Sequence, residues 1–122
     1  MTYLAISIGA VLGANARFLF GGWVLDRMGS EFPYGTLLIN VSGSFAIGLV
    51  YALIERHGEP GWVRPLVMVG FLGAYTTFST FSLDTLALAE KGAWIAAGAY
   101  IGASIAASLA AVWAGVTLGG AG

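Results

Sequence analysis

The chain has 122 residues, of which 58% are hydrophobic and only 9% are charged, and its formal net charge is -1. A soluble domain carries about a quarter of its residues as charged side chains, so this composition excludes an ordinary water-exposed surface and indicates a membrane protein. The sequence contains no cysteine, which excludes disulfides and thiolate chemistry, and it has no basic patch that would bind nucleic acid.

Charge-poor stretches mark four predicted transmembrane helices, at about residues 3–25, 34–54, 62–90 and 94–118. Because one span takes roughly 20 apolar residues, these helices would use nearly the whole chain, residues 1–122, as a single membrane domain. The first stretch lacks the basic region and cleavage pattern of a signal peptide, so we expect it to be retained. The expected fold class is an all-α membrane protein.

Lys and Arg residues are balanced between the two sides of the predicted membrane domain. Arg56 and Arg64 fall on the side that holds both termini, and Arg27 and Lys91 fall on the other side. Since Lys and Arg in short loops set orientation, this balance favours insertion in both orientations, which would let the chain pair with an inverted copy. An accidental balance in so small a count is the alternative.

Small residues four positions apart mark helix faces on which close packing is expected. Association in lipid depends on close approach of the backbones, which Gly and Ser permit. The pairs are Gly9 and Gly13, Ser44 and Gly48, and Gly98 and Gly102.

Polar side chains inside the predicted spans are candidate functional groups, because each is costly in hydrocarbon unless it is partnered or hydrated. Arg17 lies well inside the first span, where it either turns inward toward a carboxylate or an anion or extends its side chain to the membrane surface. The amide of Asn40 must bond a neighbouring helix or a passing solute. Tyr100, Ser104 and Ser108 follow at intervals of four and would form one polar stripe, although a serine can also bond back to its own helix.

The middle of the third span, residues 70–82, reads GFLGAYTTFSTFS and is unlike a regular lipid-facing helix. Its glycines and hydroxyl residues predict a break in the helix near residues 73–80, which would require surrounding protein or a water-filled cavity and whose free carbonyls could coordinate a cation. Phe78 and Phe81 are either core residues or rings whose positive edges face a small anion. A path rich in hydrogen-bond donors and poor in charge suits a small hard anion.

Three segments, GANARF at 13–18, PYGTLLINVSGSF at 33–45 and GFLGAYTTFSTFSLD at 70–84, resemble motifs of the CrcB/Fluc family of fluoride channels. The resemblance implies a fluoride-selective ion channel that passively exports fluoride. Because neither a signal peptide nor an organelle signal is recognised, we expect the channel in the cell inner membrane of a prokaryote. It also implies an antiparallel, dual-topology homodimer with two pores. Departures from the family pattern are the lone Gly9 in the first span, Phe18 in place of Tyr, and Asp84 in place of Glu.

The resemblance further implies roles for individual residues. The fluoride pore would be lined by Asn40, Phe78, Phe81, Tyr100, Ser104 and Ser108. Arg17 and Thr36 would lie toward the aqueous vestibules. Backbone carbonyls of Gly73 and Thr76 from both subunits would hold a structural sodium ion, a hard cation that prefers oxygen ligands. The implied partners are fluoride, sodium, membrane lipid and an inverted copy of the chain.

Two other classes of function remain as alternatives. A small dual-topology multidrug/proton exporter would need a membrane-embedded carboxylate, and the first three spans offer none before Asp84. A non-transporting membrane assembly protein would use its polar stripes only for helix association. An enzyme is not expected, because the single histidine, His57, falls in a predicted loop and paired buried carboxylates are lacking.

Overall fold

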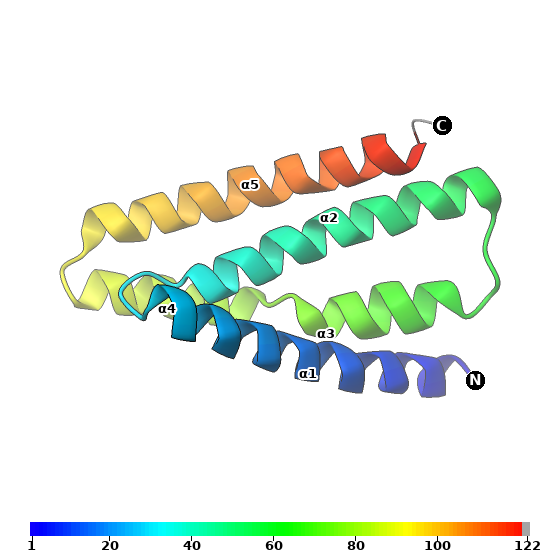
Figure 1. Cartoon of the computed structure of the whole chain (residues 1–122), viewed down its shortest axis with the longest axis horizontal. Helices are drawn as coiled ribbons and strands as arrows, with labels where there is room; N and C mark the ends of the chain where they lie inside the picture. Colours follow the sequence, from blue (N-terminus) through cyan, green and yellow to red (C-terminus); the bar gives the residue numbers. More distant parts are fainter. Residues whose placement is uncertain (121–122) are drawn as a thin grey trace.

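The computed structural model describes residues 1–120 as a bundle of long helices joined by short connections (Figure 1). The third span is composite, because a π-helix and a short α-helix precede α4. The elements are α1 (Thr2–Met28), α2 (Tyr34–His57), η1 (Arg64–Leu72), α3 (Gly73–Tyr75), α4 (Phe78–Glu90) and α5 (Trp94–Gly120). Within these residues, four helical units are long and apolar enough to cross a membrane, with η1 to α4 counted as one. The predicted all-helical chain with four such spans is confirmed.

The helices differ from the charge-poor stretches at their ends. α1 continues to Met28 and α2 to His57, past the charged residues that closed the predicted spans, whereas η1 begins at Arg64. A charged side chain at a helix end can reach out of an apolar layer while its backbone stays hydrogen-bonded, so charge marks the edge of the apolar stretch and not the end of the helix. Gly29 (φ 81) and Gly58 (φ 77) end the first two helices in a conformation that favours glycine.

Glycines allow the helices to approach closely at two contacts. The start of α1 and the end of α5 lie at the same end of the bundle in Figure 1, and α1 packs along η1 while α2 packs along α5. A Cβ built on Gly13 would collide with the backbone of Phe71, and one on Gly48 would collide with the backbone of Val112. The predicted packing roles of Gly13 and Gly48 are therefore confirmed, as is that of Gly9, which lies equally close to η1.

The third predicted glycine pair does not pack within the chain. Gly98 and Gly102 are exposed, and nothing lies within 4 Å of a Cβ built on either residue. α5 instead approaches α2 through Gly115, where a Cβ would collide with the backbone of Phe45. The expectation for Gly98 and Gly102 was wrong for contacts inside one chain, because a spacing of four defines a helix face but not the neighbour that lies against it.

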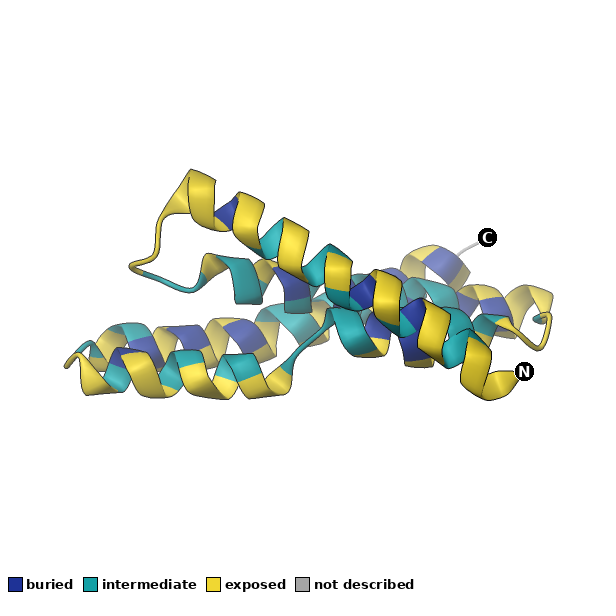
Figure 2. Ribbon diagram, turned by 90° about the horizontal axis from the view of Figure 1, so that it is seen from below, coloured by how far each residue is buried: buried dark blue, intermediate teal, exposed yellow. Residues whose placement is uncertain are grey.

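Much of the outer surface of the bundle is apolar. Figure 2 shows exposed positions along the outer sides of the long helices and buried positions mainly where helices meet. Phe18, Leu109 and Trp113 are 79%, 66% and 71% exposed. An apolar surface of this kind suits contact with lipid or with another protein surface.

Candidate functional site

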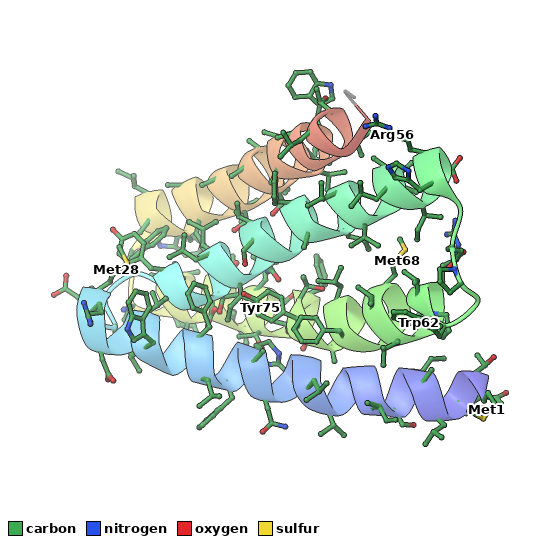
Figure 3. The ribbon with its side chains drawn as sticks, turned by 45° about the vertical axis from the view of Figure 1, so that its right-hand side comes forward. Met1, Met28, Arg56, Trp62, Met68 and Tyr75 are labelled. Atoms are coloured by element: carbon green, nitrogen blue, oxygen red, sulfur yellow. The ribbon has the colours of Figure 1, made fainter. Side chains whose placement is uncertain are left out.

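The third span leaves helical geometry at Thr76 and Thr77. Thr76 has φ -83 and ψ 157, and Thr77 has φ -150 and ψ 120, so both residues are extended. Figure 3 shows the preceding Tyr75 between the two ends of the bundle, which are marked by Met28 and Trp62. This extended segment and the adjoining short helix α3 (Gly73–Tyr75) are together called the interruption below. The extended residues deprive neighbouring peptide groups of their helical partners, so these groups need other ones.

Asn40 of α2 provides hydrogen bonds at the interruption. Its Oδ1 accepts the backbone N–H of Thr77 at 2.8 Å, and its Nδ2 donates to the carbonyl of Thr77 at 3.1 Å. In a continuous α-helix the N–H of Thr77 would donate to the carbonyl of Gly73, four residues earlier. The bond to Asn40 therefore removes that donor from Gly73, and the interhelical alternative for Asn40 is the one that the structure shows.

Thr77 is also the N-cap of α4. Its Oγ1 accepts the backbone N–H of Thr80 at 3.2 Å, which satisfies one of the free N–H groups at the start of the helix. In a continuous helix this N–H would donate to the carbonyl of Thr76, so Thr76 also loses its helical donor. Thr77 was not among the predicted site residues, although a threonine directly before a helical run is a signal for an N-cap.

Arg17 of α1 contacts the interruption from a second helix. Its Nε donates to the carbonyl of Ala74 at 3.1 Å, and the residue is half-buried. Arg17 therefore turns inward, and the partner of its Nε is a backbone carbonyl instead of a carboxylate. Near the same place, the hydroxyl groups of Ser42 and Tyr75 lie 2.9 Å apart and connect α2 to α3.

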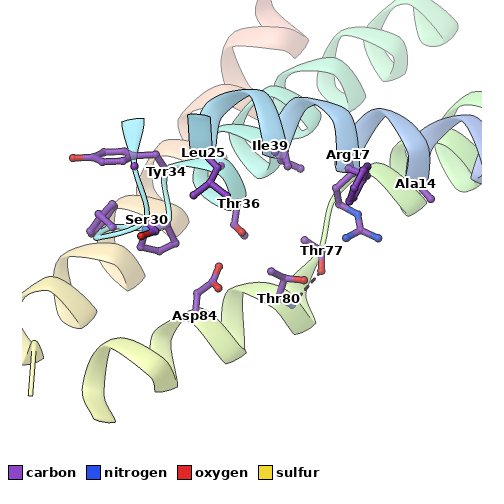
Figure 4. A pocket seen from close by; sticks show the side chains of 17 residues that line it. Ala14, Arg17, Leu25, Ser30, Tyr34, Thr36, Ile39, Thr77, Thr80 and Asp84 are labelled. Atoms are coloured by element: carbon purple, nitrogen blue, oxygen red, sulfur yellow. Dashed lines mark hydrogen bonds between the residues drawn. The ribbon is translucent and has the colours of Figure 1, made fainter. Parts of the chain in front are cut away.

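A cavity of about 560 Å³, the first cavity, opens beside the interruption. Figure 4 shows side chains from α1, α2 and α4 around it. Its lining includes both predicted vestibule residues, Arg17 and Thr36, together with Thr77, Thr80 and Asp84. A guanidinium group, a carboxylate and several hydroxyl groups therefore border the same space.

The second cavity, of about 360 Å³, brings together most of the predicted pore residues. Five of the six line it: Asn40, Phe78, Phe81, Ser104 and Ser108. Thr77 lines both cavities, so the two meet at the interruption. The Oγ of Ser104 is buried and has no hydrogen-bond partner among residues 1–120, so the structure does not show the bond back to its own helix that was the alternative for this serine.

Tyr100 lies apart from the other two residues of the predicted stripe. Its side chain is fully buried, and its ring packs against Phe32 and Phe81 with centroid distances of 5.5 and 5.2 Å. Its hydroxyl group donates to Oδ2 of Asp84 at 3.1 Å, so it points toward a residue of the first cavity. The stripe is divided because a spacing of four places residues on one helix face, whereas the long tyrosine side chain reaches beyond it.

The chain has four spans, an interrupted third span, and two cavities that meet at the interruption and have polar residues in their lining. These features define a multi-pass helical membrane protein with polar groups gathered at unwound backbone. Comparison with known families identifies it further. The family described as CrcB-like protein, Camphor Resistance (CrcB), matches residues 4–116. The chain belongs to this family, as its motifs predicted.

Similar proteins from several bacteria are named fluoride-specific ion channel FluC. The protein of Acidobacterium capsulatum is 46% identical over 121 residues, which cover 98% of this chain and 96% of that protein. The protein of Roseiflexus sp. is 46% identical over 83% of this chain and 82% of its own length. The protein of Rhizobium etli is 44% identical over 94% of this chain and 93% of its own length.

Proposed function

We propose that the protein is a fluoride-selective ion channel through which fluoride leaves the cell passively. The similar proteins named above, which belong to the same family and have a similar length, support this function. The observation that carries the proposal is the second cavity. Its lining within the described residues consists of amide, hydroxyl, aromatic and aliphatic side chains, and none of them is charged. Such a lining offers hydrogen bonds to a small anion without binding it as tightly as a cationic group would.

Three kinds of group in the second cavity can interact with fluoride. Phe78 and Phe81 both line the cavity, with ring centroids 5.5 Å apart and ring planes tilted by 48°. The partly positive edge of an aromatic ring can attract a small anion. Within residues 1–120 the hydroxyl group of Ser104 has no hydrogen-bond partner, so it can donate to an anion. The Nδ2 of Asn40 carries a second N–H besides the one that bonds Thr77. We assign these residues and Ser108 to the pore.

The first cavity is the proposed vestibule. Arg17 and Thr36 line it, and the positive charge of the guanidinium group would raise the local concentration of anions. Asp84 lines the same cavity and offsets part of that charge, while its bond to Tyr100 keeps one carboxylate oxygen engaged. We therefore place Tyr100 at the border between vestibule and pore, through its contact with Asp84, and not beside Ser104.

A pore needs a second wall, because one chain does not enclose the second cavity. Phe78 is 78% exposed, and Gly73 and Ser79 on either side of the extended residues are exposed as well. Non-helical backbone at membrane depth requires protein or a water-filled cavity around it, which lipid cannot supply. We infer that an inverted copy of the chain covers this face, so that an antiparallel homodimer forms two pores. The balance of Lys and Arg between the loops supports insertion in both orientations.

The interruption also fits a structural sodium ion. The carbonyls of Gly73 and Thr76 both lose their helical donors, one to Asn40 and the other to Thr77. Carbonyl oxygens are ligands that a hard cation prefers, and unwound backbone in transporters holds such ions. A bound sodium ion would supply positive charge that stabilises these carbonyl dipoles. In this arrangement the break in the third span lies at the middle of the membrane. The protein would be a multi-pass protein of the inner membrane, surrounded by lipid.

Ion efflux from liposomes tests the proposed function. Purified protein is reconstituted, and fluoride and chloride electrodes follow release after an ionophore for the counter-cation is added. We expect fluoride release without chloride release. Silence for both ions, from a sample shown to be dimeric, would contradict the channel and favour the exporter or the assembly protein, which proton-coupled uptake of an organic cation then separates.

A further inference from the structure

Arg17 contacts the interruption at a carbonyl that has lost its helical donor. In a continuous α-helix the carbonyl of Ala74 would accept the N–H of Phe78, but Phe78 is the first residue of α4, on the far side of the extended segment. The Nε of Arg17 donates to this carbonyl at 3.1 Å, across 57 residues of sequence. The guanidinium group therefore provides the donor that the interruption removes.

The position of Arg17 is set by the packing of α1. Gly9, Gly13 and Arg17 follow at intervals of four, so they lie on one face of this helix. A Cβ on either glycine would collide with the backbone of η1, which shows that this face is held tightly against the third span. The helix face that carries Gly9 and Gly13 brings the two backbones together. One turn later, the same face places the side chain of Arg17 next to Ala74.

Arg17 and Asn40 divide the peptide groups of the interruption between them. Arg17 binds the carbonyl of Ala74, and Asn40 binds the N–H and the carbonyl of Thr77. The carbonyls of Gly73 and Thr76 have lost their helical donors to the same network. Arg17 from α1 therefore binds the backbone between these two carbonyls, at Ala74. Asn40 from α2 binds the backbone directly after the second carbonyl, at Thr77.

We propose that Arg17 is a positioning residue, whose Nε–H fixes the carbonyl of Ala74 and thereby holds the carbonyls of Gly73 and Thr76 in the orientation that a cation at the interruption needs. The role of those two carbonyls rests on the proposed function. The role of Arg17 in ordering the interruption does not, because it follows from the contact with Ala74. The charge of the guanidinium group acts on the vestibule, whereas its Nε acts on the backbone.

Two substitutions separate the donor from the charge. Arg17→Gln and Arg17→Met both remove the charge, and both keep an unbranched side chain of similar reach. The Nε2 of glutamine comes at the same position along the side chain as the Nε of arginine and can donate to a carbonyl, whereas methionine has no donor. The charge control is the double variant Arg27→Gln/Arg56→Gln, which removes one positive charge from each side of the membrane and so keeps the balance of Lys and Arg. Neither residue lines the first cavity.

Hydrogen–deuterium exchange of the purified dimer measures the order of the interruption directly. We expect amides in residues 74–79 of Arg17→Met to exchange roughly tenfold faster than in Arg17→Gln, the effect of losing one hydrogen bond to a carbonyl. The charge control should exchange like the unsubstituted protein. Equal exchange in Arg17→Gln and Arg17→Met would overturn the proposal and leave Arg17 with a role through charge alone.

The midpoint temperature of thermal unfolding, measured in sodium chloride and in potassium chloride, provides a second readout of the cation site. A sodium-specific increase of the midpoint should persist in Arg17→Gln and be lost in Arg17→Met. If the unsubstituted protein shows no such increase, the structural sodium ion of the proposed function is contradicted, while the exchange experiment still decides the role of Arg17. If only Arg17→Gln assembles, the donor is required and the proposal is supported. If neither Arg17 variant assembles while the charge control does, a donor at this position is not sufficient and the proposal fails.

Discussion

Both polar atoms of the Asn40 side-chain amide bond the backbone of Thr77. Replacing the amide nitrogen by an oxygen should therefore weaken this contact. Asn40→Asp keeps the acceptor for the N–H of Thr77 but places a carboxylate oxygen against the carbonyl of Thr77. We expect the folded protein to lose about 2 kcal/mol of stability. The negative charge would also lie in the proposed anion path, so fluoride efflux should be nearly abolished. Robust efflux from an intact dimer would remove Asn40 from the pore.

Phe81 contacts both Phe78 and Tyr100, so its ring is part of the helix packing and also of the second cavity. Phe81→Ile keeps an apolar side chain and removes the positive ring edge. We expect the dimer to assemble and fluoride efflux to fall by roughly fivefold, the effect of losing about 1 kcal/mol of aromatic interaction. Phe20→Ile is the control, because Phe20 stacks on Trp23. Unchanged efflux in Phe81→Ile would mean that the ring only packs.

At the scale of helices, close approach depends on a few glycines and not on all of them. Gly13→Ala places a methyl group against the backbone of Phe71, whereas Gly98→Ala meets nothing within 4 Å inside the chain. We expect Gly13→Ala to destabilise the protein by about 1–3 kcal/mol, because α1 must shift away from η1. Denaturation in mild detergent compares the two variants. A loss of stability in Gly98→Ala of the same size would show that this face of α5 is packed in the assembled protein.

The interruption was predicted from sequence only as a region, residues 73–80. Glycines and hydroxyl residues lower the preference for a continuous helix over the whole of this stretch, so composition alone does not choose the residues at which it ends. In the structure the extended residues are Thr76 and Thr77, next to the bonds from Asn40 and from the N-cap of α4. One of these bonds comes from another helix, and local propensity does not contain it.

At the scale of the whole molecule, the balance of charged loops predicts how the chain inserts. Arg56 and Arg64 lie on one side, and Arg27 and Lys91 lie on the other. Reporter fusions at the carboxyl terminus should therefore give signal from both sides of the membrane, because the basic residues favour neither orientation. Two lysines added beside Lys91 should shift the reporter signal to one side. A one-sided signal from the unsubstituted chain would contradict dual topology.

Composition and motif by themselves determined the class of this protein, its number of spans, its family and most of the residues that line the second cavity. They could do so because the length of an apolar stretch is a local property of the chain, and because the motif residues lie close together in sequence. Only the tertiary structure decided which polar groups meet. Asn40 with Thr77, Arg17 with Ala74, and Tyr100 with Asp84 are 37, 57 and 16 residues apart. Such pairs depend on which helix faces pack together, and periodicity along one helix does not specify its neighbour.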